Sequence, residues 1–225
     1  MVDAEFMSSK PKSKIAWIFL LLFLMPSQFA HSQWFWRAQR RDALEEYRKG
    51  NYEEAIKICK AEIASDPNNL ESYIVICWSL LNLGRYEESR TYALTGRNIS
   101  RYDPRLVEIL GEVYYFQGRN SEALQYFQEY VNLAPQGNRI NLVYYYVGEI
   151  FIRQGYFRRA DIALSTAVYY MPRNAYWWVR LAYARENAGE FREAILAYEH
   201  ALSLNENLSD ARKGLQRVSS YLADR

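Results

Sequence analysis

The sequence is dominated by a short phrase that returns at an almost constant interval. In all five copies a glycine is followed five places later by alanine or serine, and in four of them an aromatic residue stands two places after the glycine. The copies begin at Gly50, Gly84, Gly118, Gly155 and Gly189. Successive glycines are 34 residues apart, except Gly118 and Gly155, which are 37 residues apart. A fixed period in this range is typical of a helical solenoid, in which every repeat stacks on the next.

Each repeat has the spacing of two amphipathic helices, here called the first and the second helix, joined by a tight turn at the glycine. Apolar residues such as Leu106, Leu110 and Tyr114 follow one helical face. Glycine permits a positive φ just after the first helix, and prolines such as Pro67 and Pro135 redirect the chain between repeats. Because no single pair buries its own apolar faces, neighbouring pairs must stack. The small residues that let helices approach closely are Gly111 and Gly148 on first helices, and Ala55, Ala123, Ala160 and Ala194 on second helices.

A 34-residue unit with large and small residues at set places resembles the tetratricopeptide repeat (TPR) family. Five copies in phase carry this resemblance over the chain after about residue 36. It implies an all-α fold, a right-handed α-solenoid of stacked antiparallel helix pairs. Three extra residues between 137 and 141 account for the one longer interval and predict a longer turn there. With the glycine as the fifteenth residue, the units span 36–69, 70–103, 104–137, 141–174 and 175–208.

The two ends of the array differ from its middle. In unit one, Gln39 and Asp42 stand at places where the family prefers Trp and Leu, and the aromatic segment Trp34–Trp36 lies just ahead. This segment is expected to cover the exposed end of the array. Residues 209–225 have the pattern of one further amphipathic helix, with Ala211 among its apolar positions. Repeat arrays need a polar-backed cap, so we expect a C-terminal capping helix, with partner binding by this helix as the alternative.

The N-terminal segment, which spans 1–32, belongs to a different composition class. Three lysines between residues 10 and 14 precede an uninterrupted apolar run over 15–25, and small residues follow it. This pattern predicts a secretory signal peptide, residues 1–32, cleaved between Ser32 and Gln33. Eleven apolar residues rise about 16 Å as a helix, against roughly 30 Å of membrane hydrocarbon. The alternative is an uncleaved N-terminal membrane anchor.

Charge and residue content argue against two broad classes of function. Lys and Arg number 28 against 26 Asp and Glu, a net charge of +2, which is unlike the strongly basic face of a nucleic-acid-binding protein. His200 is the one histidine left after removal of residues 1–32, and it is expected at the surface. There is no Gly-rich phosphate loop, no metal-ligand cluster and no nucleophile beside a base. The sequence therefore predicts neither an enzyme nor a cofactor or metal site.

Two cysteines, Cys59 and Cys77, fall on inward-facing positions of adjacent helices. In an exported protein they could form a disulfide. Such a bridge would add roughly 3 kcal/mol to the free energy of unfolding in the chain-entropy model. The alternative is a pair of buried free thiols that pack as small apolar side chains.

The resemblance also implies a binding groove, lined by first helices at unit positions two, five, nine, twelve and thirteen. Aromatic residues and arginine at such positions are typical of recognition surfaces. We expect Tyr145 and Tyr183 to face the groove, whereas packing between helices is an equal alternative for Trp78 and Tyr115. The clamp of some co-chaperones requires polar or basic groups where Ile74 and Trp78 stand, so that mode is disfavoured. The predicted partner-binding groove comprises Arg40, Tyr47, Arg48, Trp78, Asn82, Glu112, Tyr115, Tyr145, Glu149, Arg153, Tyr176, Tyr183 and Asn187.

Together these features predict a non-enzymatic protein–protein interaction scaffold in the cell envelope. It would bind a peptide or helix of a protein partner in its groove and aid assembly of an envelope complex. The expected location is the bacterial periplasm, or the membrane facing the periplasm if the N-terminal segment stays uncleaved. The alternative function is a structural component that forms homo-oligomers through Trp34–Trp36.

Overall fold

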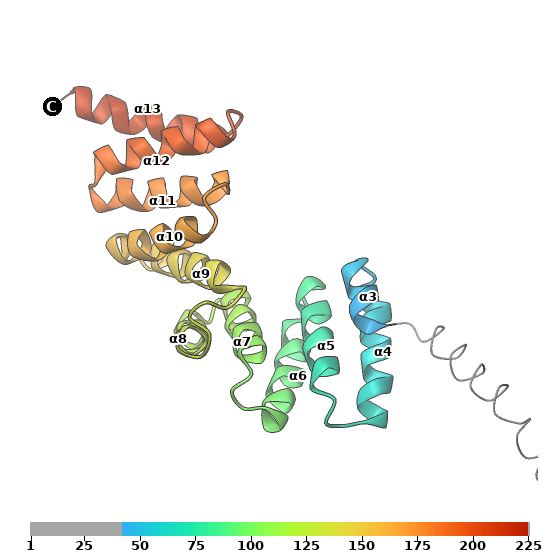
Figure 1. Ribbon diagram of the computed structural model, residues 1–225. Helices are drawn as coiled ribbons and strands as arrows, with labels where there is room; N and C mark the ends of the chain where they lie inside the picture. The colour runs from blue at the N-terminus through green and yellow to red at the C-terminus, as the bar shows by residue number, and fades with distance from the viewer. Residues whose placement is uncertain (1–41, 225) are drawn as a thin grey trace, which may run out of the picture. The chain divides into compact units, whose positions relative to one another are not determined.

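The computed structural model describes residues 42–224, and all regular structure in this range is helical (Figure 1). None of the helices in it is long and apolar enough to cross a membrane. The predicted signal peptide, the segment Trp34–Trp36 and the groove residue Arg40 lie outside the described residues. The helices are α3 (Ala43–Arg48), α4 (Tyr52–Ser65), α5 (Leu70–Asn82), α6 (Tyr86–Ile99), α7 (Pro104–Phe116), α8 (Asn120–Leu133), α9 (Ile140–Arg153), α10 (Phe157–Tyr170), α11 (Ala175–Ala188), α12 (Phe191–Leu204) and α13 (Ser209–Ala223).

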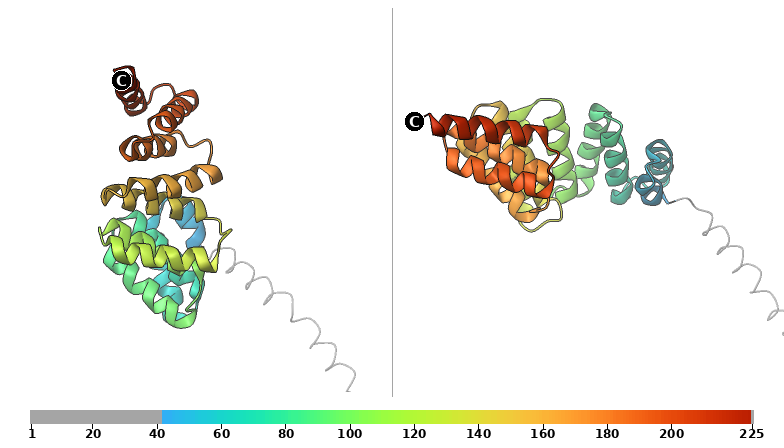
Figure 2. Two further views of the ribbon diagram at one scale, coloured as in Figure 1. Left: turned by 90° about the vertical axis from the view of Figure 1, so that its left-hand side faces the viewer. Right: turned by 90° about the horizontal axis from the view of Figure 1, so that it is seen from above.

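Every helix packs against the next one in chain order, which produces a stack of antiparallel pairs (Figures 1 and 2). The first helices of successive pairs also contact each other, in the order α3, α5, α7, α9 and α11, and α11 in turn contacts α13. The predicted all-α fold of stacked antiparallel helix pairs is therefore confirmed.

The repeated glycine ends each first helix. Its φ is positive in every copy, between 70° at Gly84 and 85° at Gly189. A side chain at this φ would be strained, whereas glycine reverses the chain and lets the second helix start within a few residues. The role predicted for the repeated glycine is confirmed.

Short polar side chains cap the N-termini of several first helices. The side chains of Asn69, Asp103 and Asn174 accept hydrogen bonds from backbone N–H groups of the first turn in α5, α7 and α11. This satisfies a donor that has no partner inside the helix. In α7, Pro104 also occupies the first helical position, where its missing N–H costs nothing.

The turn that contains the extra residues is longer than the others. Six residues, 134–139, separate α8 from α9, whereas four residues separate the other successive pairs. Two of the three extra residues lengthen the turn, and the third, Ile140, joins α9. This change places Arg139 at the N-terminal end of α9, where its side chain reaches back to the preceding unit.

Small residues hold the two helices of a pair close together. A β-carbon built on Gly111 would lie 2.5 Å from Cε1 of Phe127, and one built on Gly148 would lie 2.5 Å from Cγ of Leu164. Both large side chains are fully buried. The second helices contribute the small side chains that are fully buried at equivalent places, Ala55, Ser89, Ala123, Ala160 and Ala194.

Both cysteines are buried, and no bond joins their sulfur atoms in the structure. The possible disulfide stays a prediction for the exported protein. The Cys77 thiol donates to the carbonyl oxygen of Ser89 at 3.4 Å, and the Ser89 hydroxyl donates to the carbonyl oxygen of Cys77 at 3.1 Å. Ser89 thus replaces the usual alanine and links α5 to α6. Burial strongly raises the pKa of Cys77, which keeps it a protonated and unreactive thiol.

We expect both thiols to resist alkylation in the folded protein and to react only after denaturation. Intact mass should show no adduct on native protein and one adduct on each cysteine in denaturant, without a reducing agent. A protein that needs reduction before it reacts would instead contain the bridge.

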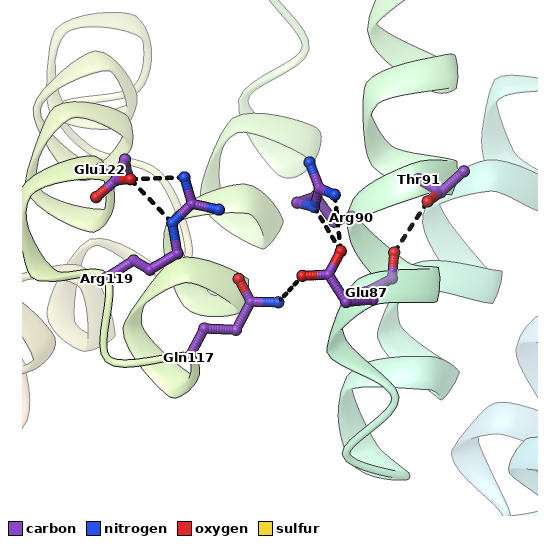
Figure 3. A network of polar contacts seen from close by, with 6 residues as sticks. All are labelled: Glu87, Arg90, Thr91, Gln117, Arg119 and Glu122. Atoms are coloured by element: carbon purple, nitrogen blue, oxygen red, sulfur yellow. Dashed lines mark hydrogen bonds and ion pairs between the residues drawn. The ribbon is translucent and has the colours of Figure 1, made fainter.

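Exposed ion pairs and hydrogen bonds form a polar network on units two and three (Figure 3). Glu87, at the start of α6, accepts from Arg90 Nε and Nη2 at 2.9 and 2.7 Å, and from Gln117 Nε2 at 2.7 Å. Arg119 pairs with Glu122 on α8 in the same manner, at 2.6 Å. The contact from Gln117 joins the end of α7 to the start of α6, and thereby unit three to unit two.

Candidate binding groove

Three of the predicted groove tyrosines lie together in one pocket. Tyr145 on α9 and Tyr176 and Tyr183 on α11 line a cavity of about 420 Å³. Tyr176 is exposed, whereas Tyr145 and Tyr183 are half-buried. The other residues that line the pocket are Val179, Arg180, Tyr198, Asp210, Lys213 and Arg217.

Ring contacts hold the two half-buried tyrosines in place. Tyr145 stacks on Trp177, with ring centroids 4.9 Å apart and planes 10° from parallel. Tyr183 meets the edge of Phe157 at 6.3 Å and lies under the guanidinium of Arg180 at 5.3 Å. Burial and the neighbouring Glu149 raise the pKa of Tyr145 to about 12, so its hydroxyl stays neutral and able to donate. The pocket therefore offers fixed aromatic faces with polar ends, which suits recognition of another chain.

The helix predicted as a cap completes this pocket. Asp210, Lys213 and Arg217 on α13 form part of its lining. A β-carbon on Gly214 would overlap the ring of Tyr198, so glycine lets α13 pack closely on α12. Sequence reasoning did not assign these residues to the groove, although a signal was present. Continuing the repeat count past residue 208 places them at positions two, five and nine of a sixth first helix.

Two predicted groove residues, Glu112 and Glu149, are buried beneath arginines of the next unit. Arg139 donates through Nε to Glu108 at 2.7 Å and through Nη2 to Glu112. Arg180 donates through the same two nitrogens to Glu149, at 2.6 and 2.9 Å. These two carboxylates are therefore buried under the arginines and are not exposed at the surface of the predicted groove.

The pair Glu108 and Glu112 shares a single guanidinium. Both carboxylates are buried, with 1% and 5% of their surface exposed. Burial and the charge of Glu112 raise the pKa of Glu108 well above its ordinary value, and Arg139 opposes this shift. Loss of hydration on burial, and then repulsion by the neighbouring carboxylate, favour the protonated form of Glu108.

Aromatic groove candidates nearer the N-terminus pack between helices. Tyr115 is buried and contacts the ring of Tyr146 at 4.5 Å. Trp78 is half-buried and lies 5.8 Å from the ring of Tyr47. For these positions the structure places the rings in contacts between units, which corresponds to the packing alternative for Trp78 and Tyr115.

The remaining predicted residues stand at the ends of first helices and are exposed. Asn82 and Asn187 donate to carbonyl oxygens one turn earlier, at 2.9 and 2.8 Å. Arg153 lies over the ring of Tyr115 at 4.1 Å. Together with Arg48 on α3, these residues border the groove side of the stack without lining the pocket.

His200 on α12 is exposed and packs against Trp178, with ring centroids 4.3 Å apart. In this part of the chain no three His, Cys, Asp or Glu side chains come close enough to hold a metal ion. The residues that line the pocket offer aromatic faces, tyrosine hydroxyls and guanidinium groups for binding.

Comparison with known sequences identifies the repeat. A family model described as "Tetratricopeptide repeat" matches residues 13–146, and a second model with the same description matches residues 176–208. Among curated proteins, none matches the chain.

Several solved structures share the fold at low sequence identity. MamA from Desulfovibrio magneticus RS-1 is 18% identical, with a TM-score of 0.64 over 74% of this chain and 93% of that one. YrrB, described as a TPR protein with an unusual peptide-binding site, is 16% identical, with a TM-score of 0.67 over 74% and 84%. PilW, described as a widely conserved type IV pilus biogenesis factor, is 20% identical, with a TM-score of 0.64 over 81% and 88%.

Proposed function

The chain belongs to the tetratricopeptide repeat family, and we propose that it is a non-enzymatic scaffold that binds a segment of a protein partner. The observation that carries this proposal is the pocket between α9, α11 and α13. Tyr145, Tyr176 and Tyr183 converge there at positions predicted for a groove. Aromatic and arginine side chains in a partly enclosed site are the groups that dominate affinity in protein interfaces.

The proposed setting is the cell envelope, with the array on the periplasmic side of a bacterial inner membrane. The support for this location is the basic and apolar pattern of the N-terminal segment, 1–32. There the scaffold would aid assembly of an envelope complex. PilW, which has the same fold, is named as a pilus biogenesis factor, and YrrB as a peptide-binding protein. Their low identity limits the comparison to the fold, so the binding proposal rests on the pocket of this chain.

We expect the double variant Tyr145→Ala/Tyr183→Ala to lose capture of the envelope partner. Truncating two aromatic anchors typically weakens binding by about 2 kcal/mol or more, which corresponds to a loss of about thirtyfold or more in affinity. The measurement is crosslinking of the full-length protein in its native envelope, followed by quantification of the captured partner.

A matched control removes two tyrosines outside the pocket. Tyr102 and Tyr169 are 64% and 80% exposed, so Tyr102→Ala/Tyr169→Ala should leave capture unchanged. Both double variants should retain the helical circular dichroism of the parent protein. Undiminished capture by a folded Tyr145→Ala/Tyr183→Ala variant would exclude the pocket as the binding site.

A further inference from the structure

The second helix of unit four, α10, begins differently from the second helices of the other units. Four places after the repeated glycine every other unit has a glutamate, whereas α10 has Arg159. Arg158 precedes it, and both arginines are exposed. Acidic groups stabilise the N-terminal end of a helix, so α10 lacks a favourable interaction that its counterparts have. The glutamates at the equivalent places are Glu54, Glu88, Glu122 and Glu193.

Large apolar side chains also replace polar or small ones on the exposed side of α10. Ile162 is 71% exposed and Tyr169 is 80% exposed. Because they are seven residues apart, they lie on the same side of the helix, about 10 Å apart along its axis. Tyr170 and Met171 extend this apolar surface, and unit five shares only the first replacement, with Leu196. The equivalent residues elsewhere are Lys57, Thr91 and Gln125 for Ile162, and Ala64, Asn98, Asn132 and Ser203 for Tyr169.

The arginines beside this apolar surface are not balanced by carboxylates within residues 42–224. Arg158, Arg159 and Arg173 form no ion pair with this part of the chain. Asp161, the one acidic residue of α10, is half-buried and accepts from Arg185 Nε at 2.9 Å. Two arginines stand at the start of α10 and Arg173 follows its end. The surface therefore has apolar groups in its middle and unbalanced positive charge at both ends.

We call this surface the α10 face and define it by Arg158, Arg159, Ile162, Tyr169, Met171 and Arg173. With 3.6 residues per turn, the four of these residues that belong to the helix fall within about 100° of its circumference. They can therefore contact one ligand together. None of the six residues lines the tyrosine pocket, so the α10 face is separate from the proposed groove.

A second copy of this chain would be a poor ligand for the α10 face. Since both ends of the face are positively charged, parallel and antiparallel pairing of two such faces would each bring arginines of one copy against arginines of the other. Like charges at an interface repel when no carboxylate lies between them. The ligand should therefore be apolar opposite Ile162 and Tyr169 and negatively charged opposite the arginines.

We propose that the α10 face binds the surface of an anionic lipid bilayer. A bilayer combines the two required properties, since its acyl chains lie beneath a layer of phosphate groups. Ile162 and Met171 enter the boundary between these layers, and the apolar ring and polar hydroxyl of Tyr169 suit the same depth. The arginine side chains extend to the phosphate groups and form charge-assisted hydrogen bonds with them. In this arrangement α10 lies parallel to the membrane plane.

The exposure of the apolar residues favours a bilayer over a protein ligand. Anchor residues of protein interfaces typically lie in well-packed pockets, and Tyr145 has such an environment through its stacking on Trp177. Tyr169 and Ile162 instead protrude, with most of their surface in contact with solvent. Protruding apolar side chains beside arginines are typical of helices that lie in a membrane interface.

A fluorescent probe on α10 tests this contact in the whole chain. Thr166 lies between Ile162 and Tyr169 on the same side of α10, and Thr95 occupies the equivalent place on α6. Their hydroxyls donate to the carbonyl oxygen four residues earlier, at 3.0 and 2.9 Å, so Thr166→Cys and Thr95→Cys are matched variants. Each is labelled with nitrobenzoxadiazole and mixed with phosphatidylcholine vesicles, with or without phosphatidylglycerol.

We expect the probe at Thr166→Cys to gain emission severalfold on vesicles that contain phosphatidylglycerol, and nitroxide-labelled lipid should quench it. The probe at Thr95→Cys should not respond, because α6 begins with Glu87 and Glu88. Added salt should weaken the response at α10. Each probe reports on its own helix, so attachment through another part of the chain does not produce this difference.

Two charge variants test the role of the arginines. In the labelled protein, Arg158→Gln/Arg159→Gln should raise the lipid concentration at half response by about fivefold for each arginine removed. The control Lys60→Gln/Arg101→Gln removes the same charge from exposed residues elsewhere and should respond as the parent does.

Two further variants test the apolar part of the α10 face. Ile162→Gln/Tyr169→Asn introduces the residues that unit three has at these places and should raise the lipid concentration at half response about tenfold or more. The control Tyr102→Asn removes a tyrosine that is 64% exposed outside the α10 face and should change nothing. Tyr169 lies outside the tyrosine pocket, so it remains a control residue for partner capture.

Equal responses of the Thr166→Cys probe to vesicles with and without phosphatidylglycerol would overturn the proposal, as would no response at all. A response that requires lipid-free envelope protein, or that rises with the concentration of the chain itself, would assign the face to a protein partner or to a second copy instead. Undiminished responses of the arginine variant and the apolar variant would also exclude the α10 face. Partner capture by Tyr145→Ala/Tyr183→Ala tests the groove separately, so either proposal can fail without the other.

Discussion

Replacing Arg139 by glutamine is expected to lower the free energy of unfolding by about 3 kcal/mol, the lower end of the range for a broken buried ion pair. The variant leaves Glu108 and Glu112 buried without their cation. The lower end applies because the Arg139 side chain is 41% exposed, and water can partly replace it. For a domain of this size the loss corresponds to a fall of roughly 6–12 °C in Tm. Thermal unfolding followed by circular dichroism measures it.

The second variant in this series tests the electrostatic origin of the effect. Glu108→Gln/Glu112→Gln/Arg139→Gln removes both carboxylates together with the cation and should recover most of the lost stability. Arg119→Gln, which removes an exposed pair with Glu122 (Figure 3), should leave Tm unchanged. If Arg139→Gln unfolds at the temperature of the parent protein, the buried pair does not link unit three to unit four.

Replacing Phe127 by alanine should cost about 3–5 kcal/mol, the usual loss when a buried aromatic residue leaves a cavity. Phe127 is fully buried, lies over Gly111 and stacks on Tyr146 with ring centroids 5.8 Å apart. It therefore joins both helices of unit three to the first helix of unit four. Denaturant unfolding should show the loss as a lower midpoint, whereas Phe116→Ala should cost less because Phe116 is 45% exposed.

A double-mutant cycle with Gly111 identifies the close approach as the cause. Gly111→Ala alone should cost about 1–3 kcal/mol, because its new β-carbon would overlap the ring of Phe127. In the Phe127→Ala background the same change meets an empty space and should cost much less. Strictly additive losses would show that the glycine is not required by the ring.

The groove shows which features of a binding site the sequence pattern could predict. The period of the repeat identified the helix face on which each candidate lies, and it placed Tyr145, Tyr176 and Tyr183 on a shared face that the structure turns into a pocket. It did not separate them from Glu112 and Glu149, which occupy equivalent positions but are buried. A position in a repeat determines direction, whereas exposure depends on the side chain that the next unit places above it.

The C-terminal helix contains groove residues that the sequence pattern did not identify. The amphipathic pattern of α13 was compatible with a cap, and the helix does cover α12 through the contact between Gly214 and Tyr198. Only its packing shows that Lys213 and Arg217 also enter the groove. The period was present in the sequence, but the weak similarity of residues 209–225 to a repeat unit concealed it.

The sequence by itself determined the helix pairs, their turns and the order of stacking. These features depend on local interactions, namely positive φ at glycine, capping side chains and one apolar face per helix, and the turn and the apolar face recur in every unit. The tertiary structure alone decided which groove groups are accessible. Glutamates of one unit meet arginines 31 residues later only after the units stack, and that contact buries the carboxylates and leaves the guanidiniums facing outward.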